Sequence, residues 1–170
     1  MSIKDHFTTQ HDVDKCASQV VRILRDIPEL VAWTGTTSIV KSIGFDAIGE
    51  LSPPFVVVSA IQEEDDFKPG SVATLLPVGI LIGYTVAGTI EELDDPSIIT
   101  VIQAIKAKLY GKPYFALKLT GADEVLSIGI AEFGVVDYQS QRLDNGSIEA
   151  AVLLRVTYRL SLQVTTRDSW

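Results

Sequence analysis

The clearest alternation of hydrophobic and polar positions lies near the end of the chain, within residues 147–166. The apolar positions are Leu154, Val156, Tyr158, Leu160, Leu162 and Val164, and the polar positions are Arg155, Thr157, Arg159, Ser161, Gln163 and Thr165. Because successive side chains of a strand point to opposite faces, this alternation predicts a half-buried β-strand. Such a strand would be much longer than the usual length of about five or six residues.

The residues before this strand supply a pairing partner. Residues 124–138 are rich in β-branched and aromatic side chains, and Asp144, Asn145 and Gly146 follow them. These three residue types tolerate the positive φ angles of a tight turn. The sequence therefore predicts a long C-terminal β-hairpin as the structural core.

Two segments have apolar residues at helical spacing. Residues 12–26 form the first, in which Asp12 can cap the N-terminus and Pro28 follows the end. Residues 96–110 form the second, with Pro96 at the first helical position and Gly111 after the end. The apolar stripes are Val13, Cys16, Ala17, Val20 and Leu24 in the first segment and Ile98, Val101, Ile102, Ile105 and Leu109 in the second.

Further strands are predicted at residues 55–61 and 113–120, whereas residues 29–51 indicate a loop with one short strand or helical turn. Residues 72–90 are apolar enough to consider a membrane span. However, Pro77, Gly79 and Gly83 make this stretch a poor helix, so it predicts one or two buried strands with glycine kinks. We expect no membrane partner.

Together these elements predict an α+β fold with a mixed or antiparallel sheet packed by two helices. The 170 residues fit one domain, residues 1–170, with residues 1–10 as a mobile tail. Hydrophobic residues make up 46% and charged residues 21%, which indicates a folded chain. The net charge of −8 argues against nucleic acid as the main partner, and we expect no sequence-specific nucleic-acid binding. The single cysteine excludes an internal disulfide.

Searching for chemistry gives a negative result. The sequence has no G-x-S-x-G, P-loop, C-x-x-C or H-E-x-x-H pattern. His6 and His11 lie in the expected tail, and Cys16 lies on an apolar stripe, where a small buried hydrophobe is the simpler interpretation. We therefore expect no catalytic residue, no cofactor and no metal site.

Charged residues suggest a contact surface instead. Arg155 and Arg159 share the polar face of the terminal strand, and two arginines with one orientation can bind carboxylates of a neighbouring subunit. The acidic residues Glu63, Glu64, Asp65 and Asp66 lack the spacing of a calcium loop and indicate a solvated loop, which would complement the arginines. An ordinary solvent-facing strand would show the same alternation. Self-assembly would cover the exposed edges of a long strand pair.

The order of elements over about residues 12–165 resembles that of tail terminator and tail completion proteins of tailed bacteriophages. The resemblance lies in the helix, the strand, the long apolar region, a helix starting at D-D-P-S-I-I-T-V-I-Q-A-I-K, and strands ending in R-V-T-Y-R-L-S-L-Q-V. It implies a virion protein without catalysis or cofactor, assembled in the host bacterial cytoplasm. Its partners would be copies of itself in a hexameric ring, the tail tube protein, and the neck or connector proteins at the head-tail joint.

Alternatives from other classes remain. A neck or joining protein of the virion would share these features. A small-molecule-binding protein or enzyme would use a pocket between sheet and helices, lined by convergent polar groups. A monomeric interaction module would dock on its partner by strand addition. A discrete ring, a deep polar pocket or a single open sheet edge would distinguish these three classes.

Overall fold

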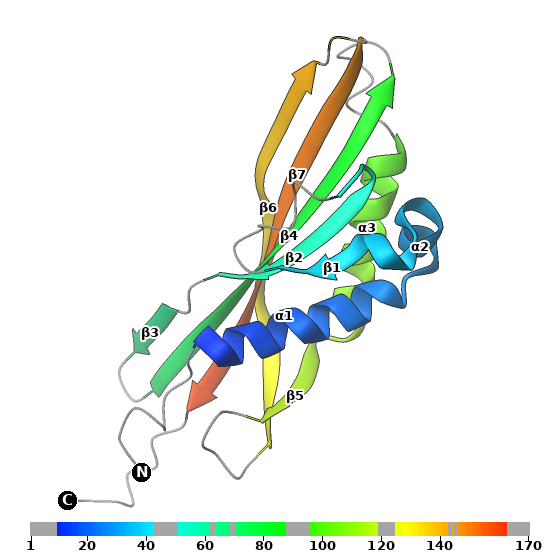
Figure 1. The fold of residues 1–170 in the computed structure, drawn as a ribbon. Helices are drawn as coiled ribbons and strands as arrows, with labels where there is room; N and C mark the ends of the chain where they lie inside the picture. The colour runs from blue at the N-terminus through cyan, green and yellow to red at the C-terminus, as the bar shows by residue number, and fades with distance from the viewer. Residues whose placement is uncertain are drawn as a thin grey trace, which may run out of the picture.

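The computed structural model describes residues 10–42, 51–61, 64–68, 71–87, 96–118, 125–142, 144 and 146–162 (Figure 1). The helices are α1 (Gln10–Arg25), α2 (Pro28–Thr34), the short 3-10 helix η2 (Thr36–Ser38) and α3 (Pro96–Gly111). The strands are β1 (Ile39–Lys41), β2 (Phe55–Ala60), β3 (Glu64–Lys68), β4 (Ser71–Ala87), β5 (Tyr114–Lys118), β6 (Val125–Arg142) and β7 (Ser147–Leu162).

These strands form one seven-stranded sheet with the order β1-β2-β4-β7-β6-β5, and β3 pairs with the first part of β4. The β1–β2 pair is parallel and the other pairs are antiparallel, so the predicted α+β fold with a mixed sheet is confirmed. The predicted C-terminal hairpin is present as β6 and β7. Gly146 in its connection has a φ of 87°, a left-handed value that glycine adopts without strain.

The described part of the apolar segment considered as a membrane span belongs to β4, one strand of 17 residues that pairs with β7 from Val72 to Ala87. Pro77 is tolerated in this central strand because of where the neighbouring strands lie. On the other side of β4, β2 pairs from Val78 onward and β3 pairs up to Leu75. The Pro77 carbonyl accepts a bond from Ile61 N at 2.9 Å, on that side. Because the N–H and C=O of a strand residue point to the same side, the missing N–H of proline costs no bond to β7.

The helices cover one face of the sheet and form a single core with it (Figure 1). The predicted apolar face of the terminal strand is confirmed where its burial is described, since Leu154, Val156 and Tyr158 are fully buried. Val164 lies outside the described residues. The predicted stripe of the first helix is fully buried, and that of α3 is buried except for the half-buried Ile102. Among the described residues, no helix is both long and apolar enough to cross a membrane.

A third helix, α2, packs against this core where the sequence predicted a loop with one short strand or helical turn; the short strand is present as β1. Its seven residues are too few to show a helical period in the sequence, although Pro28 stands at its start. Leu30 is fully buried, and the ring of Trp33 lies 6.3 Å from that of Tyr84 on β4. Burial of these side chains therefore stabilises a helix that is too short to be stable alone.

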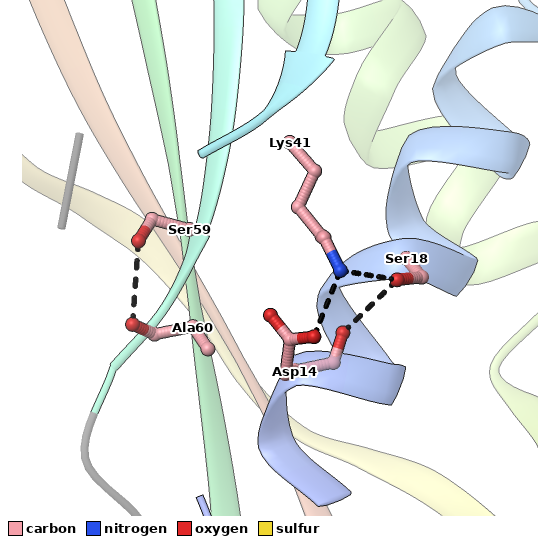
Figure 2. A network of polar contacts seen from close by, with 5 residues as sticks. All are labelled: Asp14, Ser18, Lys41, Ser59 and Ala60. Carbon is pink, nitrogen blue, oxygen red and sulfur yellow. Dashed lines mark hydrogen bonds and ion pairs between the residues drawn. The ribbon is translucent and has the colours of Figure 1, made fainter. Parts of the chain in front are cut away.

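Polar contacts tie the first helix to the edge strand β1 (Figure 2). The Lys41 ammonium donates to Asp14 Oδ2 at 2.8 Å and to Ser18 Oγ at 3.0 Å. The Arg25 guanidinium donates from Nε at 3.0 Å and from Nη2 at 2.7 Å to the Ile39 carbonyl. Strand β1 is thus held at both ends of its short span, by parallel pairing with β2 and by α1.

The predicted acidic loop is partly wrong. Glu64, Asp65 and Asp66 belong to strand β3, which forms a hairpin with β4, and Glu63 lies outside the described residues. Acidic residues are poor strand formers, so local propensity favoured a loop. Pairing with the long strand β4 overrides this propensity. The main chain of β3 gains hydrogen-bond partners along the first part of β4, with which β2 does not pair.

Candidate functional site

The face of the sheet opposite the helices is the candidate site, and we call it the open face. It is formed by the odd-numbered positions of β4 and β7, whose even-numbered positions pack under the helices. Arg155 and Arg159 both lie on it, as predicted from the alternation. The strand register arranges its residues in rows that cross several strands, so each arginine has identified neighbours.

Glycines flank the two arginines. Arg155 is paired with Gly79 on β4 and with Gly134 on β6. Arg159 is paired with Leu75 on β4 and with Gly129 on β6. Because glycine has no side chain, it leaves room over the sheet beside each arginine. Both arginines are half-buried, and each interacts with other residues of its own chain.

Two polar residues of the open face, one between the arginines and one in the row of Arg155, are not solvated, contrary to the simple interpretation of a solvent-facing strand. Thr157, paired with Pro77 on β4, is only 3% exposed, and Ser59 on β2 is 1% exposed. The Ser59 hydroxyl donates to the carbonyl of Ala60 at 3.4 Å (Figure 2). A hydroxyl loses little on burial when it finds a partner of this kind. The open face is therefore partly a second buried surface.

One predicted arginine and one predicted acid lie in the same row of the sheet within one chain. Leu75 pairs with Glu64 on one side and with Arg159 on the other. Glu64 and Arg159 thus stand two strands apart, roughly 10 Å between their main chains at the usual strand spacing. Sequence reasoning placed these residues opposite each other in different subunits. The sheet register was needed to show that they share a row.

Hollows on the open face are lined by residues that the sequence did not single out. One has a volume of about 300 Å³ and includes the row Phe55, Gly83, Ala151 and Gln139, together with polar residues at its rim. A smaller one, of about 140 Å³, adjoins it and shares Gln139 and Ala151. The expected alternative of a pocket between sheet and helices differs from this arrangement, since these hollows lie on the helix-free side.

The floor of the larger hollow depends on one glycine. A Cβ at Gly83 would lie 2.3 Å from the Cζ atom of Phe55, so the ring of Phe55 lies directly over this glycine. Gln139, Gln141 and Glu149 add two amides and one carboxylate to the lining. The arrangement offers an apolar floor with hydrogen-bonding groups around it, which suits a side chain or small ligand. In the sequence, the only signal for this hollow was the presence of small and polar residues at alternating positions of β4, β6 and β7.

Groups that could carry chemistry are placed elsewhere. Cys16 is buried in the core, as predicted, and His11 lies within α1 rather than in a tail, while His6 is outside the described residues. In the part of the chain that the structure describes, no group of three or more His, Cys, Asp or Glu residues is arranged to hold a metal ion. Burial raises the pKa of the Tyr158 hydroxyl above its ordinary value, and the neighbouring Cys16 raises it further.

Comparisons with known proteins give little further information. No family model matches the chain, and no curated protein matches it. Among solved structures, the chain is similar to a chain of a structure described as the virion of a native gene transfer agent particle, with 16% sequence identity and a TM-score of 0.45. The alignment covers 94% of this chain and 100% of that one. At this identity and TM-score the similarity carries no argument about function, and no residue role is transferred from it.

Proposed function

We propose that this chain is a structural protein of the virion of a tailed bacteriophage or a related particle. More specifically, we propose a tail terminator or head-tail connector subunit that forms a ring, caps the tail tube and joins it to the neck. The proposal rests on the order of elements that resembles the tail terminators. In this role the chain has no catalytic activity, binds the tube and neck proteins, and assembles in the cytoplasm of the host bacterium.

The observation that carries the proposal is the unpaired edge of β6. Strand β5 pairs with β6 only from Val125 to Gly129, and within the described ranges only β7, on the other side of β6, pairs with it beyond that point. Exposed sheet edges invite pairing with another chain, so proteins usually cover them. A neighbouring subunit would cover this one.

A ring follows if two different surfaces of the chain meet. Such head-to-tail contacts close into a ring when the rotation between neighbours divides a full turn, and a hexamer is the expected form. We propose that Arg155 and Arg159 contribute to the subunit contacts by binding carboxylates of a neighbouring copy. The acids Glu63, Glu64, Asp65 and Asp66 contribute to the same assembly.

Solution mass is the test of this function. We expect light scattering of the purified chain to give a discrete oligomer, and negative-stain images of the same peak to show rings with a central hole that bind purified tail tubes. The double variant Arg155→Glu with Arg159→Glu should lower the oligomer fraction. An unchanged oligomer mass in that variant would contradict the role of the arginines in the subunit contact, but it would not contradict the ring.

The same unpaired edge favours one second candidate, an interaction module that docks on a different protein by strand addition. That module would remain a monomer at every concentration and would gain mass only with its partner. The two functions therefore differ in one observable, the mass of the isolated chain. A concentration series from micromolar to millimolar distinguishes them.

A further inference from the structure

The free edge of β6 combines an open main chain with exposed apolar side chains. We call residues 131–142 of this strand the β6 edge. It starts after the bond from Ile130 N to the Pro113 carbonyl, at 2.9 Å. Val135 is 58% exposed and Val136 is 56% exposed, which is unusual for adjacent valines. Val135 is paired with Leu154, so it lies on the helix side of the sheet.

Helix α3 extends this apolar surface. Tyr110 is 48% exposed, and its ring lies 6.1 Å from the ring of Phe133 on β6. Phe133 is only two residues from Val135 along the strand. Tyr110, Phe133 and Val135 therefore form one apolar strip along the helix side of the β6 edge, and the exposed Val136 follows Val135 in the chain.

Lysines flank the strip. The Lys106 ammonium lies 5.7 Å from the centre of the Tyr110 ring. Lys112 is exposed and adjoins Pro113, whose carbonyl accepts the bond from Ile130. The acidic residues nearest to the edge, Glu132 and Asp137, pair with Thr157 and Leu153 and so belong to the open face. The helix side of the β6 edge is accordingly apolar and basic.

The acidic strand β3 lies at the opposite edge of the same sheet. It pairs, among the described strands, with β4 alone, so its other side is also an edge. Its sequence is Glu64, Asp65, Asp66, Phe67 and Lys68, three acids followed by an aromatic residue and one base. The helix side of the β6 edge, with the lysines of α3, is therefore opposite in charge to the sequence of β3, and among the described strands each edge has main-chain groups available for pairing.

We propose that β3 of one copy docks as an added strand on the β6 edge of the next copy, beside Lys106 and Lys112. This inference rests on the proposed function, because it identifies the contact that would close the ring. Register shifts at Ile130/Glu132 and Val135/Asp137 leave a regular run of β6 between them, from Glu132 to Val135. That run matches the five residues of β3 within one residue. Main-chain bonds give affinity, and the charge pattern selects this partner.

The contact joins two different surfaces, so every copy uses both edges. Each copy would offer its β3 to one neighbour and its β6 edge to the other, which is the head-to-tail arrangement that generates rings. It also assigns the acids of β3 to the lysines of α3 in the neighbouring copy.

Charge-swapped variants test this arrangement. The first variant is Lys106→Glu with Lys112→Glu, and the second is Asp65→Lys with Asp66→Lys. Each variant alone places like charges at every contact, so we expect its dissociation constant for assembly to rise by at least about tenfold. An equimolar mixture has opposite charges at every contact between unlike copies and should recover the mass of the unaltered oligomer. Arg22→Glu, at an exposed position of α1, is the control and should leave the mass unchanged.

The outcomes separate the contact from the function. Variants that assemble like the unaltered chain overturn the proposed contact but not the proposed ring. A mixture of folded variants that stays monomeric also overturns the contact and not the ring. An unaltered chain that is monomeric at every concentration overturns both. Should a variant fail to fold by circular dichroism, the salt dependence of the unaltered chain decides. Assembly should weaken between about 0.1 M and 1 M salt, where the screening length falls from about 10 Å to about 3 Å. Assembly that is insensitive to salt contradicts the contact.

Discussion

The two faces of β7 follow different rules, although they come from the same 16 residues. On the helix side, every second residue from Ile148 to Tyr158 is buried in one core. On the open face, half-buried arginines alternate with the buried Thr157 and the half-buried Leu153. On the face that the helices cover, the alternation of the strand itself predicts which residues are buried. On the face without helices, the burial of each residue depends on its neighbours across the sheet, such as the glycines beside Arg155.

The largest expected effect compares adjacent leucines on the two faces. Leu154→Ala removes a fully buried side chain under the helices and should lower the free energy of unfolding by about 2–5 kcal/mol. Leu153→Ala makes the same chemical change on the open face, where the residue is half-buried, and should cost roughly half of that or less. Urea denaturation of both variants measures the difference. Equal losses would mean that the open face is packed as tightly as the core.

A pair of glycines examines the packing of the open face itself. Gly83→Ala places a Cβ against the Phe55 ring and should cost about 1–3 kcal/mol of unfolding free energy through overpacking. Gly134→Ala is the matched control, since nothing lies within 4 Å of a Cβ at that position. The control should change stability much less in the same denaturation assay. A Gly83→Ala variant as stable as the control would show that the ring moves aside freely.

Alkaline pH probes the buried side of β7 through Tyr158. The ordinary pKa of this hydroxyl is 10.0, and burial raises it in the folded chain. The unfolded chain therefore ionises first, so the contribution of Tyr158 to stability is constant below about pH 10 and falls as the pH rises above it, by at most about 1.4 kcal/mol per pH unit. Tyr158→Phe should flatten this part of the curve of unfolding free energy against pH. If the unfolding free energy of the variant fell with pH at the same slope, the alkaline loss of stability would not come from Tyr158.

The smallest expected effect concerns the ion pair of Lys41 with Asp14, which joins β1 to α1. Lys41 and Asp14 are about one-third exposed, so Lys41→Ala should cost only about 0.2–1 kcal/mol. A double-mutant cycle with Asp14→Ala isolates the coupling, and added salt should weaken it. A coupling free energy well above 1 kcal/mol would indicate that this ion pair, and not apolar packing alone, holds the helices on the sheet.

Sequence reasoning succeeded where one element carries a long period. The stripes of α1 and α3 and the alternation around Leu154 were sufficient to place the core residues of these three elements. For α2, which is too short to show a period, it predicted at most one helical turn, and it failed for β3, whose acids favour a loop in isolation. The adjacent valines at 135 and 136 break the two-residue alternation and were the available signal for the bulge in β6, where an extra residue is inserted.

Candidate site residues show the same limit. Arg155 and Arg159 could be assigned to one face from alternation alone, because the side-chain period of a strand is two. Their glycine neighbours, the row shared by Arg159 and Glu64, and the hollow over Gly83 could not be derived. Each depends on register between strands far apart in the sequence, and register is not encoded in any single segment.

By itself, then, the sequence determined the α+β class, the long C-terminal hairpin and the residues that pack beneath the helices. These features arise from local patterns of polarity, which act within one helix or one strand. Only the tertiary structure decided the order of the strands, the burial of Thr157 on the polar face, and the pairing of the acidic strand β3 with β4. Those features arise from long-range pairing, in which the partner of each strand depends on the positions of all the others.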